Sequence, residues 1–238
     1  GGAKLDLATC GGLVLAVGGI LGGLILEGGN IHDVAQVTAA MIVFGGTLGA
    51  VLVTTPVRTL VCAVKKIGLV FASRDHNPAA VIDEIIRFAT KARRSGIVSL
   101  EAEVEEVDDP FLRKALGLAI DGMDLNELRK MMELEMALEE QRSEEQARVY
   151  ESAGGYAPTI GIIGAVLGLI QVMKNLENID EVGRGIAVAF VATVYGVGSA
   201  NLFFLPAGNK LKARARQQAL ARELVLEGVS AIVEGLNP

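Results

Sequence analysis

Four long stretches of the chain contain no Asp, Glu, Lys or Arg. They cover residues 7–26, 34–57, 152–173 and 185–209, and each is between 20 and 25 residues long. A helix of about 20 residues, rising ~1.5 Å per residue, crosses a hydrocarbon core of ~30 Å. Buried helices of a soluble protein are the alternative, but such helices normally carry a charged face. The pattern therefore predicts an all-α membrane protein with four transmembrane helices, at about 7–26, 34–57, 155–173 and 185–207.

The charged residues make up 21% of a chain that is 51% hydrophobic, and they lie outside these stretches. Residues 55–151 hold 14 of the 22 Lys and Arg residues, and the tail after Gly208 holds five more. The short connections at 27–33 and 174–184 hold only Lys174 and Arg184. Because loops rich in Lys and Arg stay in the cytoplasm, we expect the long segment and both termini there, in a multi-pass membrane protein.

The two ends of the chain carry signs of processing. The first apolar stretch is too long for a signal peptide, and no small-residue cleavage site precedes a mature domain, so we expect it to remain as a span. The chain begins Gly1-Gly2-Ala3 without a methionine, which is typical of a processing scar. Its helical pattern is still running at Pro238, which is typical of a truncated chain.

Residues 58–151 have the apolar spacing of amphipathic helices. Asn77-Pro78 is a favourable helix start, with an N-cap residue before a proline at the first helical position. Asp124 to Glu127 resembles a capping box, which would open a long helix that continues toward the third span. Apolar residues recur at helical spacing in three sets: Val81, Ile82, Ile85, Ile86 and Ala89; Phe111, Leu112, Ala115, Leu116 and Ala119; and Leu125, Leu128, Met131, Met132 and Leu138.

These patterns predict four parts along the chain. The first two spans occupy 5–57, and a cytoplasmic helical domain occupies 58–151. The last two spans occupy 152–209, and a cytoplasmic C-terminal helix occupies 210–238.

Small residues recur at helical spacing in all four predicted spans. The third span has Gly161, Gly164 and Gly168, and the fourth has Gly196 among several alanines. Small residues four apart let helix backbones approach closely in lipid, where packing replaces the hydrophobic effect as the driving force. We therefore expect these four glycines to pack helices tightly, within a subunit or between subunits. An adventitious abundance of Gly and Ala is the alternative.

No Asp, Glu, Lys, Arg or His lies inside any predicted span. A proton or sodium pathway needs an ionisable group at membrane depth, so this chain either conducts nothing or depends on a partner helix that supplies a carboxylate. Pro158 and Pro206, near the ends of the third and fourth spans, each remove a backbone donor. The freed carbonyls need partners, often where a helix lines a cavity or moves; a plain kink is the alternative.

Other chemistry has little support in the sequence. His32 and His76 have no ligand-like neighbours, so we expect neither a metal site nor a cofactor. No set of nucleophile and base and no phosphate-binding loop is present, which argues against an enzyme. We expect the lipid bilayer as an environment and no nucleic acid as a partner.

Several stretches resemble the MotA family of flagellar motor stator subunits. Residues 155–170, GYAPTIGIIGAVLGLI, are similar to that family's third span, and residues 186–196, IAVAFVATVYG, to its fourth. Residues 204–211, FLPAGNKL, resemble its exit from the fourth span, and residues 5–9 resemble its N-terminus. Residues 227–238 are similar to its C-terminal motif. The related TolQ and ExbB proteins usually have three spans, so four spans favour MotA.

The resemblance implies an ion-conducting stator subunit for motility and chemotaxis. It implies a homo-oligomer, a pentamer, around two copies of a single-span MotB-type partner whose Asp carries the ion. It also implies that the cytoplasmic domain contacts the rotor protein FliG through an Arg and a Glu eight residues apart, here Arg93 and Glu101, with Arg94 alongside. Solvated surface charges are the alternative for these residues. Pro158 and Pro206 match the two functional prolines of the family.

The identity of the ion depends on two positions. Sodium needs several oxygen ligands, whereas a proton needs only a titrating carboxylate and a water chain. Sodium-driven relatives resemble each other in having a Thr where this chain has Ala165, opposite a second Thr that is kept here as Thr193. Because Ala165 offers no side-chain oxygen, we predict a proton pathway.

Two alternatives from other classes remain open. One is an energiser of the TolQ or ExbB type, which drives a periplasmic protein. The other is a non-conducting membrane scaffold, whose small-residue seams assemble spans and whose loop recruits partners.

Overall fold

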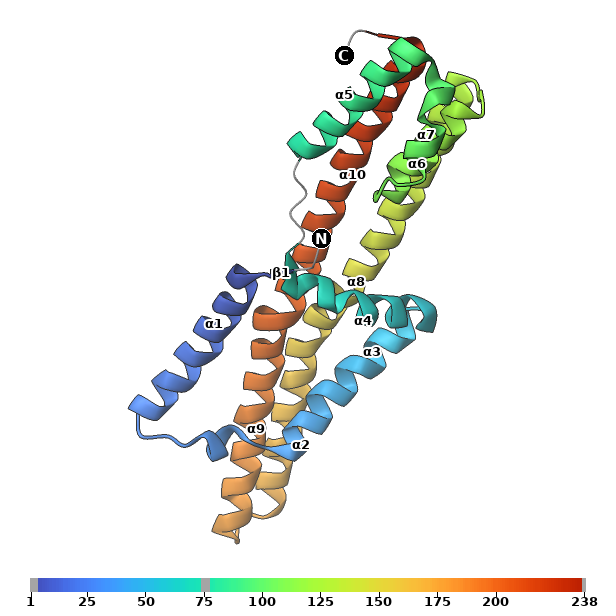
Figure 1. Ribbon diagram of the computed structural model, residues 1–238. Helices are drawn as coiled ribbons and strands as arrows, with labels where there is room; N and C mark the ends of the chain where they lie inside the picture. The colour runs from blue at the N-terminus through green and yellow to red at the C-terminus, as the bar shows by residue number, and fades with distance from the viewer. Residues whose placement is uncertain (1–3, 74–77, 237–238) are drawn as a thin grey trace. The chain divides into compact units, whose positions relative to one another are not determined.

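The computed structural model describes residues 4–73 and 78–236, and almost all of them are helical (Figure 1). Four helices are long and apolar enough to cross a membrane: Leu7–Leu26, Val37–Thr54, Leu125–Lys174 and Ile179–Glu234. The predicted all-α class with four candidate spans is therefore confirmed. The proposed N-cap Asn77 and His76 lie outside the described residues.

The contacts divide the chain into two compact units. The first combines Gly1–Ser73 with Glu144–Lys212, and the second combines Arg74–Ser143 with Ala213–Pro238. Two long helices contribute residues to both units: α8 spans Leu125–Lys174, and α10 spans Leu205–Glu234. Each unit is described by itself below.

The first unit holds all four apolar stretches. Helix α1 spans Leu7–Leu26, with Asp6 as the N-cap that accepts a hydrogen bond from the Thr9 backbone N–H at 3.2 Å. Strand β1, Lys4–Leu5, precedes α1 and pairs antiparallel with β2, Ala72–Ser73. The body of α1 has no buried residue, so its backbone is attached chiefly at this end.

The second span is shorter than the predicted 34–57. A 3₁₀ turn η1, Ile31–Val34, precedes it, and α2, Val37–Ala40, continues through the π-helical turn η2, Met41–Gly45, into α3, Gly46–Thr54. The helix ends because Thr55 precedes Pro56: the proline ring disfavours the helical conformation for the residue before it. Thr55 accordingly has φ −129° and ψ 131°, an extended conformation.

Sequence reasoning missed one helix and misplaced the start of another. Helix α4, Val57–Phe71, follows Pro56 directly and is amphipathic, with Ala63 and Val70 buried. Helix α9, Ile179–Ser199, begins six residues before the predicted 185 because Asn178 caps it, accepting from the backbone N–H groups of Asp180 and Glu181. The π-helical turn η4, Ala200–Phe204, joins α9 to α10 without a break.

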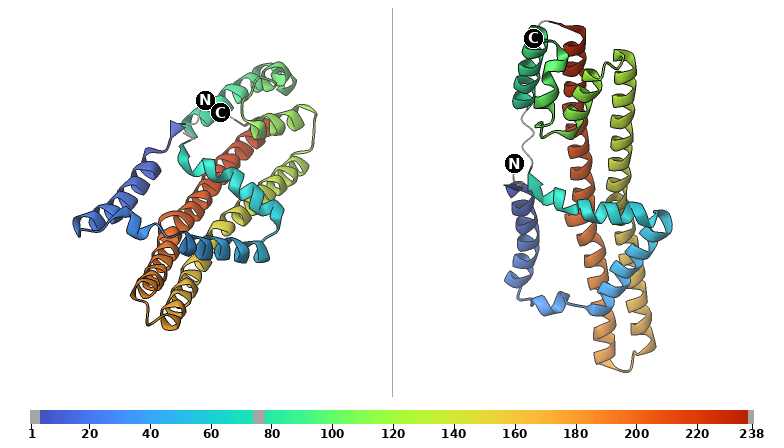
Figure 2. Two further views of the ribbon diagram at one scale, coloured as in Figure 1. Left: turned by 90° about the horizontal axis from the view of Figure 1, so that it is seen from below. Right: turned by 45° about the vertical axis from the view of Figure 1, so that its right-hand side comes forward.

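The second unit is a helical bundle around one apolar core (Figure 2). It contains α5, Pro78–Ser95; the 3₁₀ turn η3, Ile97–Leu100; α6, Glu101–Val104; and α7, Pro110–Ile120. The beginning of α8 and the end of α10 complete it. All five apolar residues predicted for one face of α7 are buried: Phe111, Leu112, Ala115, Leu116 and Ala119. Asp109 and Pro110 start this helix as N-cap and first helical residue.

Candidate functional site

Helices α8 and α9 pack backbone to backbone in the first unit. A Cβ added to Gly168 would lie 2.6 Å from the Gly185 carbonyl oxygen and 2.7 Å from the Ala189 nitrogen. A Cβ on Gly196 would lie 2.5 Å from the Ala157 carbonyl oxygen. Such approaches leave no room for any side chain, and in lipid they are a main source of helix association.

The four glycines singled out in the sequence all lie on this contact. Gly161, Gly164, Gly168 and Gly196 are buried. A Cβ on Gly161 would meet the Ala192 carbonyl oxygen at 2.9 Å, and one on Gly164 would meet the Ala192 Cβ at 2.6 Å. The glycines of α1 differ, because nothing lies within 4 Å of a Cβ added at Gly11, Gly12, Gly18, Gly19, Gly22 or Gly23. Within one protomer, therefore, the small residues of α1 have no such contact.

The two prolines lie on neighbouring turns of α8 and α10. Pro158 leaves the carbonyl of Gly154, four residues earlier, without its usual helical donor. A Cβ added to Gly154 would lie 2.6 Å from the Leu205 side chain and 3.5 Å from the Leu205 nitrogen, the residue before Pro206. The geometry therefore brings the turn interrupted by Pro158 next to the start of the turn that contains Pro206.

A π-helical turn immediately precedes Pro206. Because Pro206 has no N–H and its ring would clash with the carbonyl of Leu202 in a regular α-helix, the backbone needs extra room there. The π-helical turn Ala200–Phe204 provides a wider ring of backbone at this point. Such turns are rare and occur often at functional sites. Apart from the proline, no sequence pattern indicates this one.

Ala165 and Thr193 border the same helix contact. Both are half-buried. Thr193 lies with its Cα 3.5 Å from a Cβ added at Gly161, and Ala165 is one turn further along α8. The Thr193 hydroxyl donates to the Ala189 carbonyl oxygen at 3.2 Å on its own helix, which leaves its oxygen lone pairs available to accept.

The three residues predicted to face the rotor are exposed in the second unit. Arg93 and Arg94 lie in the last turn of α5, and Glu101 begins α6. Between them the chain turns at Gly96, whose φ of 81° is in the left-handed region that glycine tolerates best. The 3₁₀ turn Ile97–Leu100, which follows Gly96, contacts α5 and leads directly into α6.

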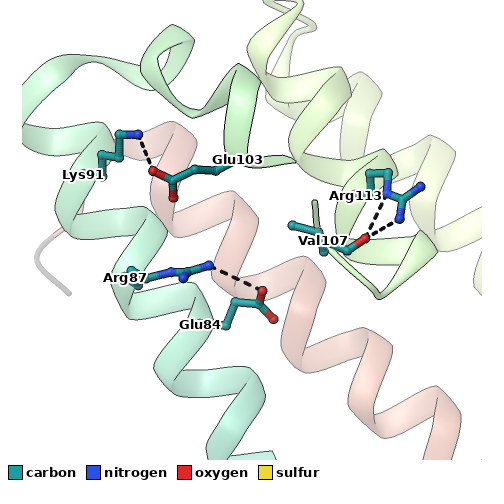
Figure 3. A network of polar contacts seen from close by, with 6 residues as sticks. All are labelled: Glu84, Arg87, Lys91, Glu103, Val107 and Arg113. Atoms are coloured by element: carbon teal, nitrogen blue, oxygen red, sulfur yellow. Dashed lines mark hydrogen bonds and ion pairs between the residues drawn. The ribbon is translucent and has the colours of Figure 1, made fainter. Parts of the chain in front are cut away.

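An ion pair fastens α6 to α5 beneath these residues (Figure 3). Lys91 Nζ donates to Glu103 Oε1, and this hydrogen bond, more than any other effect, lowers the pKa of the Glu103 carboxyl. Arg113 Nε donates to the Val107 carbonyl oxygen at 2.9 Å and so ties the start of α7 to the loop after α6. Helices α5 and α6, which carry the exposed Arg and Glu residues, are thus held together by the Lys91–Glu103 ion pair. The sequence patterns did not single out this pair.

A second ion pair holds the N-terminus of α1. Lys210 Nζ in α10 donates to Asp6 Oδ2 and to the Thr9 hydroxyl. The hydrogen bond from Lys210 is the main reason that the pKa of Asp6 falls to about 2. Sequence reasoning missed this pair because its partners are 204 residues apart. Lys210 and Thr9 also line a cavity of about 290 Å³ that is formed by α1, the end of α4 and the residues around Pro206.

A further polar contact holds the loop between the first two spans. The Tyr195 hydroxyl of α9 donates to the Val34 carbonyl oxygen and accepts from the Gln36 backbone N–H at 3.3 Å. Thr47 in α3 is different: its hydroxyl oxygen is buried and has no hydrogen-bond partner within the described residues. Since buried polar groups are normally satisfied, Thr47 is an exception that the sequence did not indicate.

Two family models together match most of the chain. Residues 10–96 match the motility protein A N-terminal model, and residues 103–224 match the MotA/TolQ/ExbB proton channel family. Among similar proteins, motility protein A of Helicobacter pylori is 37% identical over 98% of this chain and 91% of its own length. Motility protein A of Bacillus subtilis is 35% identical over 98% of this chain and 87% of its own.

Solved structures agree with the sequence matches. The MotAB structure of C. jejuni aligns with a TM-score of 0.93 at 35% identity, covering 98% of this chain and 92% of the matched chain. The flagellar MotAB stator complex of Bacillus subtilis aligns with a TM-score of 0.87 at 34% identity, covering 95% and 90%. The resemblance to the MotA family is therefore confirmed along almost the whole chain, which belongs to the MotA/TolQ/ExbB proton channel family.

Proposed function

We propose that this stator subunit of the bacterial flagellar motor conducts protons together with a MotB-type partner and converts their flow into torque on the rotor. One observation carries the proposal: the four apolar stretches contain no Asp, Glu, Lys, Arg or His. A proton relay through the membrane needs at least one. The carboxylate must then come from another chain, and the solved relatives are MotAB complexes, one of them described as a flagellar stator.

The proposed pathway runs beside the α8–α9 contact. Thr193 offers one oxygen there, whereas Ala165 offers none in its side chain, so a sodium cage would lack a ligand. The turns at Pro158 and Pro206 supply backbone carbonyls that lack helical donors. A carboxylate on a partner helix could exchange a proton near these groups through water, and its protonation would change what it contacts. Gly161, Gly164, Gly168 and Gly196 would hold the two helices rigid beside it.

The proposed assembly is a homo-oligomer, a pentamer by family resemblance, around a dimer of the single-span partner. The uneven distribution of Lys and Arg supports an inner-membrane orientation with both termini and the second unit in the cytoplasm. There Arg93, Arg94 and Glu101 would meet charged groups of the rotor protein FliG. Complementary charges set register and specificity in such contacts more than affinity, as a repeatedly engaging motor requires.

Swimming of a complemented strain tests this function against the alternatives. A motile bacterium that lacks its own stator genes would receive this chain together with a MotB-type partner. We expect swimming to return, and to remain when sodium is replaced by potassium at constant proton-motive force. Cells that assemble flagella and insert the complex but stay immotile would contradict the stator role and favour an energiser or a scaffold.

A further inference from the structure

Two apolar stripes of the cytoplasmic unit are exposed although the sequence pattern predicts them on core-facing helices. On α5, Ile85 is 8% exposed, whereas Ile82 and Ile86 are 41% and 43% exposed. On α8, Leu128 and Met132 are fully buried. In contrast, the α8 residues on the adjoining face remain accessible, namely Met131 at 42%, Leu134 at 60% and Leu138 at 46%. Contiguous exposed apolar residues of this kind mark an interaction surface.

The two stripes have different shapes. Met131, Leu134 and Leu138 form the apolar part of a groove of about 380 Å³, and its charged walls are Lys114, Glu135, Glu139, Arg142 and Arg222. Ile82 and Ile86 instead project from the exposed side of a single helix and form a ridge. A ridge and a groove can fit one another, whereas two ridges cannot pack closely.

The ridge and the groove lie at the same height of the unit. Ile85, next to Ile86, packs against Gly228 of α10. Glu227, next to Gly228, forms a bidentate ion pair with Arg129 of α8, with both N–O distances 2.9 Å. Helices α5 and α8 also lie on opposite sides of α10 in this unit (Figures 1 and 2). With the ridge on one side of the unit and the groove on its other side, at one height, copies of the unit can pack side by side.

Charges beside the two stripes are complementary. Asp83 stands next to the ridge, and Lys130 is one turn before Leu134 beside the groove. Both side chains are exposed, and neither has an ion-pair partner in the part of the chain that the structure describes. When Ile86 meets Met131 and Ile82 meets Leu134 in an antiparallel pairing of the helices, Asp83 and Lys130 come within reach of one another.

We propose that the Ile82–Ile86 ridge of one subunit fits into the Met131–Leu134–Leu138 groove of the next subunit. The two surfaces differ, so the contact is heterologous and repeats from copy to copy until it closes a ring. Membrane insertion supports closure, because it holds all copies upright in one plane. The inference rests on the proposed homo-oligomer and goes beyond it by naming the two faces that meet.

Disulfide cross-linking tests this contact in the assembled stator complex. Cys10 and Cys62 are first replaced by alanine, and the complex is checked for swimming and for its mass in mild detergent. Two pairs are then introduced, Ile86→Cys with Met131→Cys and Ile82→Cys with Leu134→Cys, because disulfides need Cα atoms about 4.4–6.8 Å apart. Val98→Cys with Met131→Cys is the control, since Val98 is 63% exposed but lies outside the ridge.

Oxidation should convert each ridge–groove pair into a ladder of covalent oligomers that ends at the full ring, while the control pair stays monomeric. Each single-cysteine variant should also stay monomeric, and a mixture of the two singles should stop at dimers. No ladder in an intact, motile oligomer would overturn the interface and leave the proposed function standing. Dimers from Ile86→Cys alone, a ladder from the control, or cross-links to another protein would overturn it too. A monomeric, inactive preparation before oxidation would instead contradict the proposed function.

Discussion

Replacing Gly196 by alanine is expected to destabilise the protein and abolish swimming. The added Cβ would lie 2.5 Å from the Ala157 carbonyl oxygen and 3.0 Å from the Gly161 Cα. These are backbone atoms of a neighbouring helix, so α8 and α9 must separate to admit one methyl group. Overpacking of this kind costs about 1–3 kcal/mol, and it outweighs the gain of up to about 1 kcal/mol that alanine brings to a helix.

Gly198→Ala is the matched control on the same helix. Nothing lies within 4 Å of a Cβ added at Gly198. Its substitution should leave the unfolding midpoint unchanged or slightly raised, and swimming should persist. The measurement is thermal unfolding of the purified complex in detergent, with swimming speed alongside. If both variants behaved alike, the tight α8–α9 contact would not be what holds the pathway together.

Reversing the charges of Arg93 and Glu101 together should stop rotation without dismantling the complex. Both side chains are exposed, and the Lys91–Glu103 ion pair that holds α5 against α6 is left in place. The substitutions Arg93→Glu and Glu101→Lys therefore change the surface offered to the rotor more than the fold. Unfavourable charge contacts with a partner suppress binding strongly, so we expect swimming to be lost.

Two readouts separate a rotor defect from a folding defect. Membrane content of the complex and its proton leak should match those of the parent protein, because neither residue belongs to the unit that contains the spans. The control is Arg216→Glu, which reverses an exposed charge away from the proposed surface. This substitution should leave swimming intact. Normal swimming of the double reversal would show that the rotor is contacted elsewhere.

Sequence patterns predicted those parts of the fold that depend on residues close together in the chain. The uncharged run 7–26 matches the bounds of α1, because Asp6 and Glu27 flank it and Asp6 caps the helix. The five buried residues of α7 follow from their spacing alone. Uncharged runs do not indicate helix α4, because it carries Arg58, Lys65 and Lys66, although its apolar residues recur at helical spacing.

What the sequence did not indicate depends on residues far apart in the chain. The pair between Asp6 and Lys210 and the contact of Gly154 with Leu205 each join residues that lie far apart in the chain. The π-helical turn before Pro206 has no spacing signature of its own. The sequence also did not indicate the exposure of Ile82, Ile86 and Met131. Helical periodicity shows that a face is apolar, but it does not show whether the residues that cover this face belong to the same subunit.

Ion flux through the purified complex tests the central claim most directly. The chain and its single-span partner would be reconstituted in liposomes, and proton and sodium gradients would be imposed separately. We expect proton flux without sodium, no current from a sodium gradient alone, and loss of flux when the partner's intramembrane Asp is changed to Asn. Flux that required sodium, or that persisted without the partner, would contradict the proposal that this chain frames a proton pathway whose carboxylate comes from another subunit.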